Sequence, residues 1–399
     1  MPSTDLQRLR DLWDDFLDGL KAGADHVLDP DRPGDEDDRV EGLRHLLRSV
    51  ARGVSTNLEG GGLSHPELAW MHPFKSGQDN PDGLYQGAAL DLANTYRLSG
   101  NLGSVRYLAV TLMDFDFGGG PIQQHLNLNS DGLGADDNGD FSAVFSSAPP
   151  PEGGADTWFQ LPAVHTTLFV RQFFADWEHE EPADLHLECL DPGPATSRLD
   201  ADGLEAALGR LTHIGTALPA FWADFGQAHL RRDEVNTFAH VAPGPRSTLS
   251  QGGSPDQAYG QCWWRVAEDE ALLYEVPVPE CHYWGVQLGD VWFQSLDWVN
   301  RQSSLNDHQA VVDADGVFRA VIAHRDPGVA NWLDTGGASE GCITYRWNQF
   351  ESAPVPDVRL VPFDEVDHHL PDGTTRVTPG ERAEVLRRRR RGALRRFRR

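Results

Sequence analysis

The N-terminal part of the chain alternates apolar and polar positions at helical spacing. Apolar residues recur three or four positions apart at Leu6, Leu9, Trp13, Phe16, Leu17 and Leu20, and Thr4 with Gln7 fits a capping box. This pattern predicts an amphipathic helix over residues 4–20. The same spacing predicts a second helix over residues 39–58, with Asp38 as its N-cap, and Gly60-Gly61-Gly62 ends the helical unit.

After these helices the pattern changes to short runs of apolar, β-branched and aromatic residues, separated by turn residues. Strands are predicted at residues 95–99, 105–113, 166–174, 185–190, 272–276, 283–288, 308–313, 318–324 and 341–347. The runs 308–313 and 318–324 are joined by Ala314-Asp315-Gly316, which is typical of a hairpin turn. Helical spacing returns at residues 203–230, where Pro219 should kink or divide the helix, and in a basic helix at 381–399.

This order of elements predicts an α+β fold that is rich in β-structure. We expect an antiparallel β-sandwich or open barrel and not a parallel nucleotide-binding sheet. The sandwich, with N-terminal helices, a mid-chain helical segment and a basic C-terminal helix, is the architecture that we predict. No repeat of fixed period is apparent. The predicted parts are an N-terminal helical segment (1–62), a β-rich domain (63–195), a helical insertion and linker (196–254), a C-terminal β-sandwich domain (255–375) and a basic helical tail (376–399).

The charge balance is acidic, with 61 acidic against 34 basic side chains and a net charge of −27. An acidic body repels polyanions, so neither nucleic acid nor an anionic membrane is an expected partner of the main surface. Arginines concentrate in the tail, residues 387–399. That tail could bind RNA or anionic lipid, contact an acidic surface of this protein or of a neighbour, or remain solvated, and the acidic body favours the last two.

The cysteines and the N-terminus bear on the cellular compartment. Cys189, Cys262, Cys281 and Cys342 show no close spacing, so they are expected to be reduced thiols. The first residues are charged and lack the apolar stretch of a signal peptide. The sequence therefore predicts a cytoplasmic protein.

The run from Tyr283 through Trp347 carries a family resemblance. The residues involved are Ser295-Leu296-Asp297, Asn300-Arg301, Ser304-Leu305-Asn306, Asp315-Gly316, Asp326-Pro327-Gly328, Asn331-Trp332-Leu333-Asp334 and Arg346-Trp347, with Asn80-Pro81-Asp82, Tyr85, Thr95-Tyr96-Arg97 and Gly100 earlier in the chain. In these residues the chain resembles the domain-of-unknown-function 1214 family. The resemblance implies a β-rich fold, a jelly-roll-like antiparallel sandwich, and it implies no activity.

Motifs for common cofactors are missing from the sequence. No GxSxG, GxGxxG, P-loop or HExxH motif occurs, so nothing supports a nucleotide, flavin or zinc-protease function. Cys281-His282 and Asp367-His368-His369 lack the spacing of metal ligands, because adjacent residues on a strand point to opposite faces. We therefore expect no cofactor and no metal site.

A cluster of polar residues set among tryptophans is the candidate binding site. Its members are Trp298, Asn300, Arg301, Asn331, Trp332, Asp334 and Arg346. A guanidinium grips a carboxylate or sulfate, amides and carboxylates bind hydroxyls, and a tryptophan face forms an apolar platform. This combination suits a carbohydrate or another hydroxylated ring. The alternative is structural: Asp326-Pro327-Gly328 is a turn, Asn331 and Asp334 cap it, and the arginines pair with them.

The candidate catalytic residues are Asp326, Glu275 and His282, with Glu280 close by in the sequence. A carboxylate and an imidazole on adjacent strands form an acid–base set, and Arg301 or Arg346 would clamp an anion. The alternative is that these charges are exposed strand ends. Three functions follow: an acid–base enzyme acting on a hydroxylated or glycosidic small molecule, a non-catalytic carbohydrate or small-ligand binding module, or a homo-oligomeric assembly protein.

Overall fold

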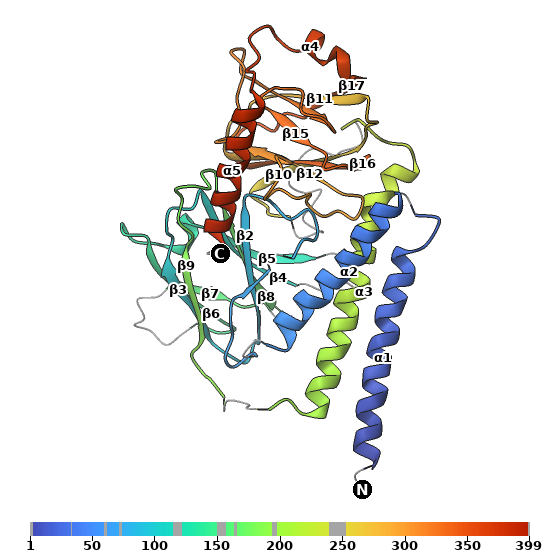
Figure 1. Cartoon of the computed structure of the whole chain (residues 1–399). Helices are drawn as coiled ribbons and strands as arrows, with labels where there is room; N and C mark the ends of the chain where they lie inside the picture. Colours follow the sequence, from blue (N-terminus) through green and yellow to red (C-terminus); the bar gives the residue numbers. More distant parts are fainter. Residues whose placement is uncertain are drawn as a thin grey trace.

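Two β-sandwiches and a layer of long helices form the molecule (Figure 1). The computed structural model describes residues 3–32, 34–59, 62–71, 74–114, 122–149, 157–162, 166–193, 198–238 and 253–397. The predicted helix end at residues 60–61 and most of the predicted linker before residue 253 lie outside these ranges. Among the described helices, none is long and apolar enough to cross a membrane.

The first sandwich is built from strands β1 to β9. One sheet has the order β1 (Ala69–Trp70), β2 (Gly83–Leu90), β8 (Thr166–Phe173), β4 (Tyr107–Asp114), β5 (Gln123–Asn129). The other has the order β7 (Thr157–Gln160), β6 (Asp140–Ser146), β3 (Tyr96–Asn101), β9 (Asp184–Cys189). Alternate residues of each strand, among them Leu98, Val110 and Leu168, fill the core between the sheets.

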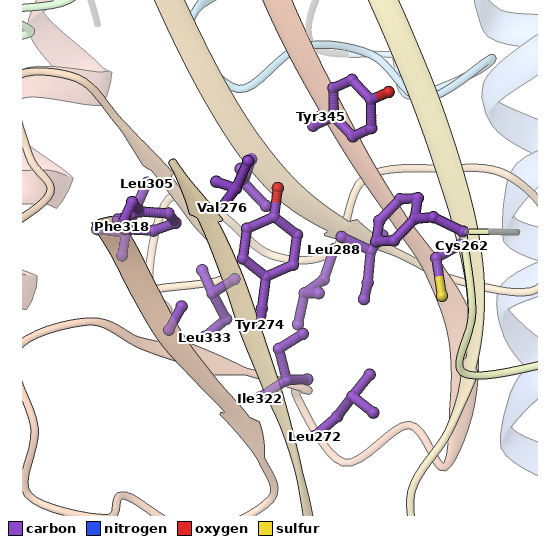
Figure 2. Packing of buried hydrophobic residues seen from close by; sticks show 14 of the residues in the cluster. Cys262, Leu272, Tyr274, Val276, Leu288, Leu305, Phe318, Ile322, Leu333 and Tyr345 are labelled. Atoms are coloured by element: carbon purple, nitrogen blue, oxygen red, sulfur yellow. The ribbon is translucent and has the colours of Figure 1, made fainter. Parts of the chain in front are cut away.

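The second sandwich is built from strands β10 to β17. One sheet has the order β10 (Gln257–Arg265), β16 (Glu340–Phe350), β12 (Cys281–Gly289), β13 (Ser304–Asn306). The other has the order β15 (Trp332–Asp334), β14 (Val317–Ala323), β11 (Glu270–Pro277), β17 (Asp357–Pro362). Figure 2 shows side chains of both sheets meeting in its core, with Tyr274, Phe318 and Ile322 packed toward Leu288 and Tyr345.

Apart from the two-residue strand β1, the two sandwiches have the same topology, strand for strand. Replacing β2 by β10, and each later strand in turn, converts the order β2-β8-β4-β5 into β10-β16-β12-β13 and β7-β6-β3-β9 into β15-β14-β11-β17. The parallel pair also recurs, as β6 with β7 and β14 with β15, while all the other pairs are antiparallel. The sequence shows no repeat of fixed period, but the second sandwich repeats the topology of the first.

Helices connect and brace the two sandwiches. α1 (Ser3–Val27) and α2 (Glu36–Asn57) pack with α3 (Ala201–Arg231), which links β9 to β10. α3 places Trp222 and Phe225 against Trp263 and Phe293 of the second sandwich. α5 (Pro379–Arg396), shown in red in Figure 1, follows the short helix α4 (Val366–His369) and runs back toward the first sandwich. Each sandwich is thus followed by a helix that packs on the other one.

The structure confirms the β-rich α+β class and corrects several details. α2 begins earlier than predicted, because Asp35 is its N-cap and Asp38 completes the capping box. Pro219 does not divide α3, which is continuous from Ala201 to Arg231. Sequence periodicity also missed strands with few apolar residues, such as β5, and very short ones, such as β13.

The predicted strand at residues 308–313 is wrong. Only a single bridge, between Val312 and Phe318, forms there, although the turn does close, with the Gly316 amide donating to the Asp313 carbonyl. The reason lies in side chains from elsewhere. The Asn331 side chain accepts from the Val311 N–H and donates to the Val311 carbonyl. The Asn306 side-chain oxygen accepts from the backbone amides of His308 and Gln309. These bonds satisfy the backbone without a strand ladder.

Candidate functional site between the two sandwiches

The outer face of the β2-β8-β4 sheet packs against the outer face of the β10-β16-β12 sheet. Aromatic rings cross this contact: Phe173 stacks on Tyr107 at 5.3 Å and on Tyr283 of the other sandwich at 5.6 Å between ring centroids. We call this contact the seam. Its principal polar residues are Tyr85, Tyr107, Thr111 and Arg171 from the first sandwich, and Tyr259, Tyr283, Gln287 and Arg346 from the second.

The duplicated topology places the same pair of side chains on each side of the seam. On the first sandwich, Tyr85 of β2 lies opposite Arg171 of β8 in the strand register. On the second, Tyr259 of β10 lies opposite Arg346 of β16. Residues at facing positions of an antiparallel pair project from the same face of the sheet. Each sandwich therefore presents one tyrosine and one arginine to the seam from equivalent positions.

The two guanidiniums are held in equivalent ways. Arg171 is buried, donates to the Thr111 hydroxyl at 2.8 Å and lies 4.5 Å from the ring of Phe169. Arg346 is also buried, donates to the side-chain oxygen of Gln287 and lies 5.8 Å from the Tyr259 ring. Thr111 and Gln287 occupy matching places on β4 and β12, two residues beyond the positions that pair with the arginines. The duplication thus extends to the arginine partners.

A reciprocal exchange of hydrogen bonds joins the sandwiches beside these arginines. Asp82, just before β2, accepts from the Tyr283 hydroxyl of the second sandwich at 2.7 Å. Asp256, just before β10, accepts from the Tyr107 hydroxyl of the first sandwich at 2.8 Å. Each aspartate therefore binds the tyrosine of the opposite sandwich, and the two sandwiches are related across the seam by a pseudo-two-fold arrangement.

Burial shapes the ionisation of the seam. The pKa of Asp82 is raised by burial, against the lowering effect of its bond from Tyr283 and of nearby Arg396. Burial also raises the pKa of Tyr85, while Arg346 and Arg171 act in the opposite sense. The Tyr85 hydroxyl therefore stays neutral at physiological pH and can both donate and accept a hydrogen bond.

Arg346 is a buried cation of the seam that has no negatively charged partner among the described residues. Besides Gln287, it donates to the backbone carbonyl of Gln78, so its recorded acceptors are neutral oxygens. Over the described residues it forms no ion pair, whereas buried Arg382 pairs with Asp326 at 2.9 Å. A buried cation is costly unless an anion or a full set of hydrogen bonds compensates it.

A third guanidinium and an apolar patch border the seam. Arg52 of α2 is half-buried, burial lowers its pKa to about 10, and it contacts the Met71 sulfur at 3.5 Å. The Met71 amide donates to the Tyr85 carbonyl at 3.0 Å, which ties this group to β2. Met71 and Tyr85 also pack against an apolar cluster that contains Phe169 and Ile122. The seam thus combines cationic, hydroxyl and apolar groups.

Several residues predicted to bind substrate lie away from the seam. Arg301 forms an ion pair with Asp334 at 2.9 Å and is half-exposed. The Asn300 side chain donates to the Asp297 carboxylate at 2.8 Å and accepts from Arg390 of α5. Asn331 is used entirely by backbone groups of neighbouring segments. The Trp332 indole donates to the Ala323 carbonyl at 3.0 Å. These contacts match the structural alternative.

Trp298 lies under α5 and not in a ligand pocket. Its ring meets Trp177 of the first sandwich at 5.5 Å and Phe397 at 5.9 Å. The buried Arg396 guanidinium lies 4.2 Å from the Trp177 ring and donates to the Pro81 carbonyl. The basic tail is therefore packed into this protein's own interior through part of its arginines. Arg346 alone among the predicted binding residues lies in the seam.

The three predicted catalytic residues are not brought together. Asp326 closes its own turn by accepting from the Gly328 amide, and pairs with Arg382. Glu275 lies on β11 and approaches Arg319 of β14 at 3.4 Å. His282 is exposed at the start of β12 and contacts the Arg106 carbonyl of the first sandwich at 2.6 Å. No recorded contact joins any two of them. The described residues also hold no group of three metal-ligating side chains.

The residues that sequence reasoning missed are Tyr85, Arg171 and Tyr259 as a set. A signal was present: Asn80-Pro81-Asp82 precedes Tyr85, and Ser254-Pro255-Asp256 precedes Tyr259 at the same distance. In both copies the first residue closes the turn that starts the strand, by accepting from the aspartate amide at 3.1 Å and 3.3 Å respectively. This short repeat marks the start of each sandwich.

Comparison with known proteins gives a family but no activity. A family model described as "Protein of unknown function (DUF1254)" matches residues 235–312, so the resemblance to family 1214 is wrong. The crystal structure of an uncharacterised protein from Burkholderia cenocepacia is 32% identical, with a TM-score of 0.83 over 91% of this chain and 100% of that one. A protein from Vibrio parahaemolyticus is 13% identical, with a TM-score of 0.48 over 86% and 100%. No curated protein matches.

Proposed function

This chain belongs to the same family as the uncharacterised Burkholderia cenocepacia protein, and we propose that it binds a small organic anion in the seam. The observation that carries this proposal is the duplicated tyrosine–arginine pair. Tyr85 with Arg171 and Tyr259 with Arg346 come from equivalent strands and face one contact layer. Packing alone does not require a buried guanidinium on each side of a sheet–sheet contact, because apolar residues of similar volume serve there at lower cost.

The chemistry of the seam supports an anionic ligand. A guanidinium binds a carboxylate, phosphate or sulfate through a planar fork of N–H donors, and it does so most strongly where water is excluded. Arg346 has only neutral acceptors in the described part of the structure, so an anion would complete its surroundings. The protein as a whole carries a net charge of −27, so a local concentration of arginines would set this region apart for anions.

The remaining groups of the seam define the body of the ligand. The rings and sulfur near Tyr85 offer an apolar surface, and the Tyr259 hydroxyl, which accepts from the Ser254 amide at 3.0 Å, can donate to a ligand. Binding sites for small organic molecules commonly have this composition, a mostly apolar lining with a few placed polar groups. The proposed ligand is therefore an organic acid with an apolar or hydroxylated body, and not a bare inorganic ion.

We place ligand binding ahead of the acid–base enzyme. The predicted catalytic residues Asp326, Glu275 and His282 each have separate partners, and the contact of His282 with the Arg106 carbonyl of the first sandwich leaves its side chain exposed. A general base needs to reach the proton that it abstracts, within hydrogen-bond distance or through one water. Carbohydrate binding at the predicted tryptophan cluster is likewise less favoured, because Trp298 and Trp332 are buried in structural contacts.

Two finer expectations remain part of this proposal. We propose that each sandwich is jelly-roll-like, since most successive strands cross from one sheet to the other, for example β2 to β3 and β3 to β4. We also propose a cytoplasmic location. The four cysteines are free thiols, three of them buried, which suits a reducing compartment.

A ligand screen with matched variants tests the binding proposal. Thermal unfolding would be followed with organic mono- and dicarboxylates, phosphate esters and sulfonates, and with neutral sugars as the contrasting set. A ligand at 100 times its dissociation constant stabilises the protein by about 2.7 kcal/mol. Arg346→Gln should weaken binding of the stabilising anion about tenfold or more, since one charged hydrogen-bonded contact contributes about 1.5–3 kcal/mol.

The control is Arg301→Gln, which changes an arginine of the same sandwich outside the seam. It should bind the anion as the wild type does. Circular dichroism and the unfolding midpoint without ligand would show that both variants are folded. The proposal fails if no anion stabilises the wild type, if Arg346→Gln binds as tightly as the wild type, or if both variants lose binding equally.

A further inference from the structure

An apolar stripe runs along the outer face of α1. Leu6, Trp13 and Leu17 are 57%, 54% and 45% exposed, and Leu9 beside them is 37% exposed. We call these four residues the α1 stripe. The neighbouring face of α1 is already used, because Phe16 packs with Leu208 and Leu211 of α3. In Figure 1, α1 lies at the edge of the helical layer, and packing among the described residues does not account for the exposure of the stripe.

We propose that the α1 stripe is the contact surface for a second copy of this chain, in an antiparallel helix pair. A contiguous exposed apolar surface of this kind marks an interaction site. The spacing of the stripe is symmetric about Trp13, with Leu9 four residues before it and Leu17 four residues after it. A two-fold axis at Trp13 therefore sets Trp13 against its own copy and Leu9 against Leu17 of the other chain.

The charges beside the stripe fit the same alignment. Arg10 is exposed, and in the antiparallel pair it faces the level of Phe16 in the other chain, between Asp14 and Asp18, which are also exposed. The symmetry forms this contact twice. A parallel pair would instead bring like charges to the same level, which is unfavourable. Charge complementarity thus selects the antiparallel arrangement of two identical helices.

The same charges argue against other occupants of the stripe. Asp11, Asp14, Asp15 and Asp18 are all exposed on α1 and would be repelled by an anionic membrane. A membrane-surface helix instead carries lysine and arginine on its polar face. A second copy supplies a matching apolar stripe, and its Arg10 lies at the level of Asp14 and Asp18.

Sedimentation of the full chain over a concentration series tests the proposal. The wild type should dimerise, and Trp13→Lys should weaken the dimer on the order of 100-fold, as expected for a central buried tryptophan. Val355→Lys is the matched control, since Val355 is 43% exposed but lies in the second sandwich's surface. It should leave the dimer unchanged. A monomeric wild type at all concentrations, or a Trp13→Lys protein that dimerises like the wild type, would overturn the proposal.

Two further variants test the register. With the axis at Trp13, Trp13→Cys places its thiol beside that of the second copy, so mild oxidation should form a covalent dimer. Asp15→Cys, on another side of the helix, should form no covalent dimer under the same oxidation. Arg10→Asp should weaken the dimer, and adding Asp14→Arg should restore it. Equal cross-linking of both cysteine variants, or no rescue by the charge exchange, would contradict the antiparallel register.

Discussion

The carboxylate of Asp82 accepts a hydrogen bond from the Tyr283 hydroxyl over 2.7 Å, although the two residues belong to different sandwiches. Asp82 is fully enclosed and also accepts from the indole of Trp177 and the amide of Asn306, each at 2.7 Å. The carboxylate is therefore a junction of both sandwiches. A buried carboxylate is destabilising unless hydrogen-bond donors surround it. Because the donors to Asp82 come from both sandwiches, Asp82 helps to fix the position of one sandwich on the other.

Removing the Tyr283 hydroxyl should destabilise the protein. We expect Tyr283→Phe to lower the free energy of unfolding by about 1–3 kcal/mol, because one donor to a buried carboxylate is lost. Tyr274→Phe is the control, since the Tyr274 hydroxyl is buried in the second core with no hydrogen-bond partner among the described residues. That substitution should be neutral or stabilising. Urea unfolding of both variants measures the difference, and equal losses would contradict the role of Asp82.

The buried end of α5 should contribute more to stability than its exposed arginines. Arg396 is enclosed by Trp177, Trp298 and Phe174, and lies close enough to Asp82 to affect its pKa. Arg396→Met should cost about 2–4 kcal/mol, since it removes the bond to Pro81 and leaves Asp82 with less compensation. The exposed Arg388 provides the control, because Arg388→Met should change the free energy of unfolding by less than about 0.5 kcal/mol.

The sequence predicted the local elements well and the seam poorly. Periodicity found the helices near α1, α2 and α3 because their apolar residues recur at helical spacing, and it found strands such as β12 whose alternate residues are buried in one core. Among the predicted binding residues, Arg346 lies in the seam. Its partners come from Gln78 and Gln287, far apart in the chain, and no local pattern encodes that meeting.

In the predicted tryptophan and aspartate cluster, the sequence suggested a ligand site where the structure shows structural contacts. Asn331, Trp332 and Asp334 are close in sequence and polar or aromatic, as ligand-binding residues are, but each satisfies a nearby backbone or ion-pair partner. Spacing along a chain cannot distinguish an asparagine that holds a loop from one that holds a ligand. The two proline–aspartate turns before Tyr85 and Tyr259 were the better signal, and they are too short to be recognised as a repeat without the topology.

The Arg301–Asp334 pair should have an asymmetric effect on stability. Arg301 is half-exposed, so Arg301→Gln should cost about 1 kcal/mol or less, as exposed ion pairs do. Asp334 is buried and also accepts from the Gly336 amide at 2.8 Å, so Asp334→Ala should cost about 1–3 kcal/mol. Thermal and urea unfolding of the two variants provide the measurement. If Arg301→Gln is the more damaging change, the arginine has a role beyond this pair.

His45 should make the protein lose stability in mild acid. The side chain is fully buried on α2, and burial, with a smaller contribution from Arg48, lowers its pKa to about 3, while Asp79 opposes the shift. The unfolded chain protonates the same group near pH 6.5. Between these values the unfolded state binds more protons, so the free energy of unfolding falls as the pH falls. From pH 7 to pH 5 this loss amounts to about 2 kcal/mol.

A substitution isolates this contribution from the many other acid-sensitive groups. His45→Leu removes the titrating ring, so its free energy of unfolding should fall less between pH 7 and pH 5 than that of the wild type, by about 2 kcal/mol. His368→Leu changes an exposed histidine and should leave the pH dependence as in the wild type. Because the comparison is between slopes, any constant cost of filling the site with leucine cancels. Parallel pH profiles for His45→Leu and the wild type would show that His45 does not remain neutral in the folded protein.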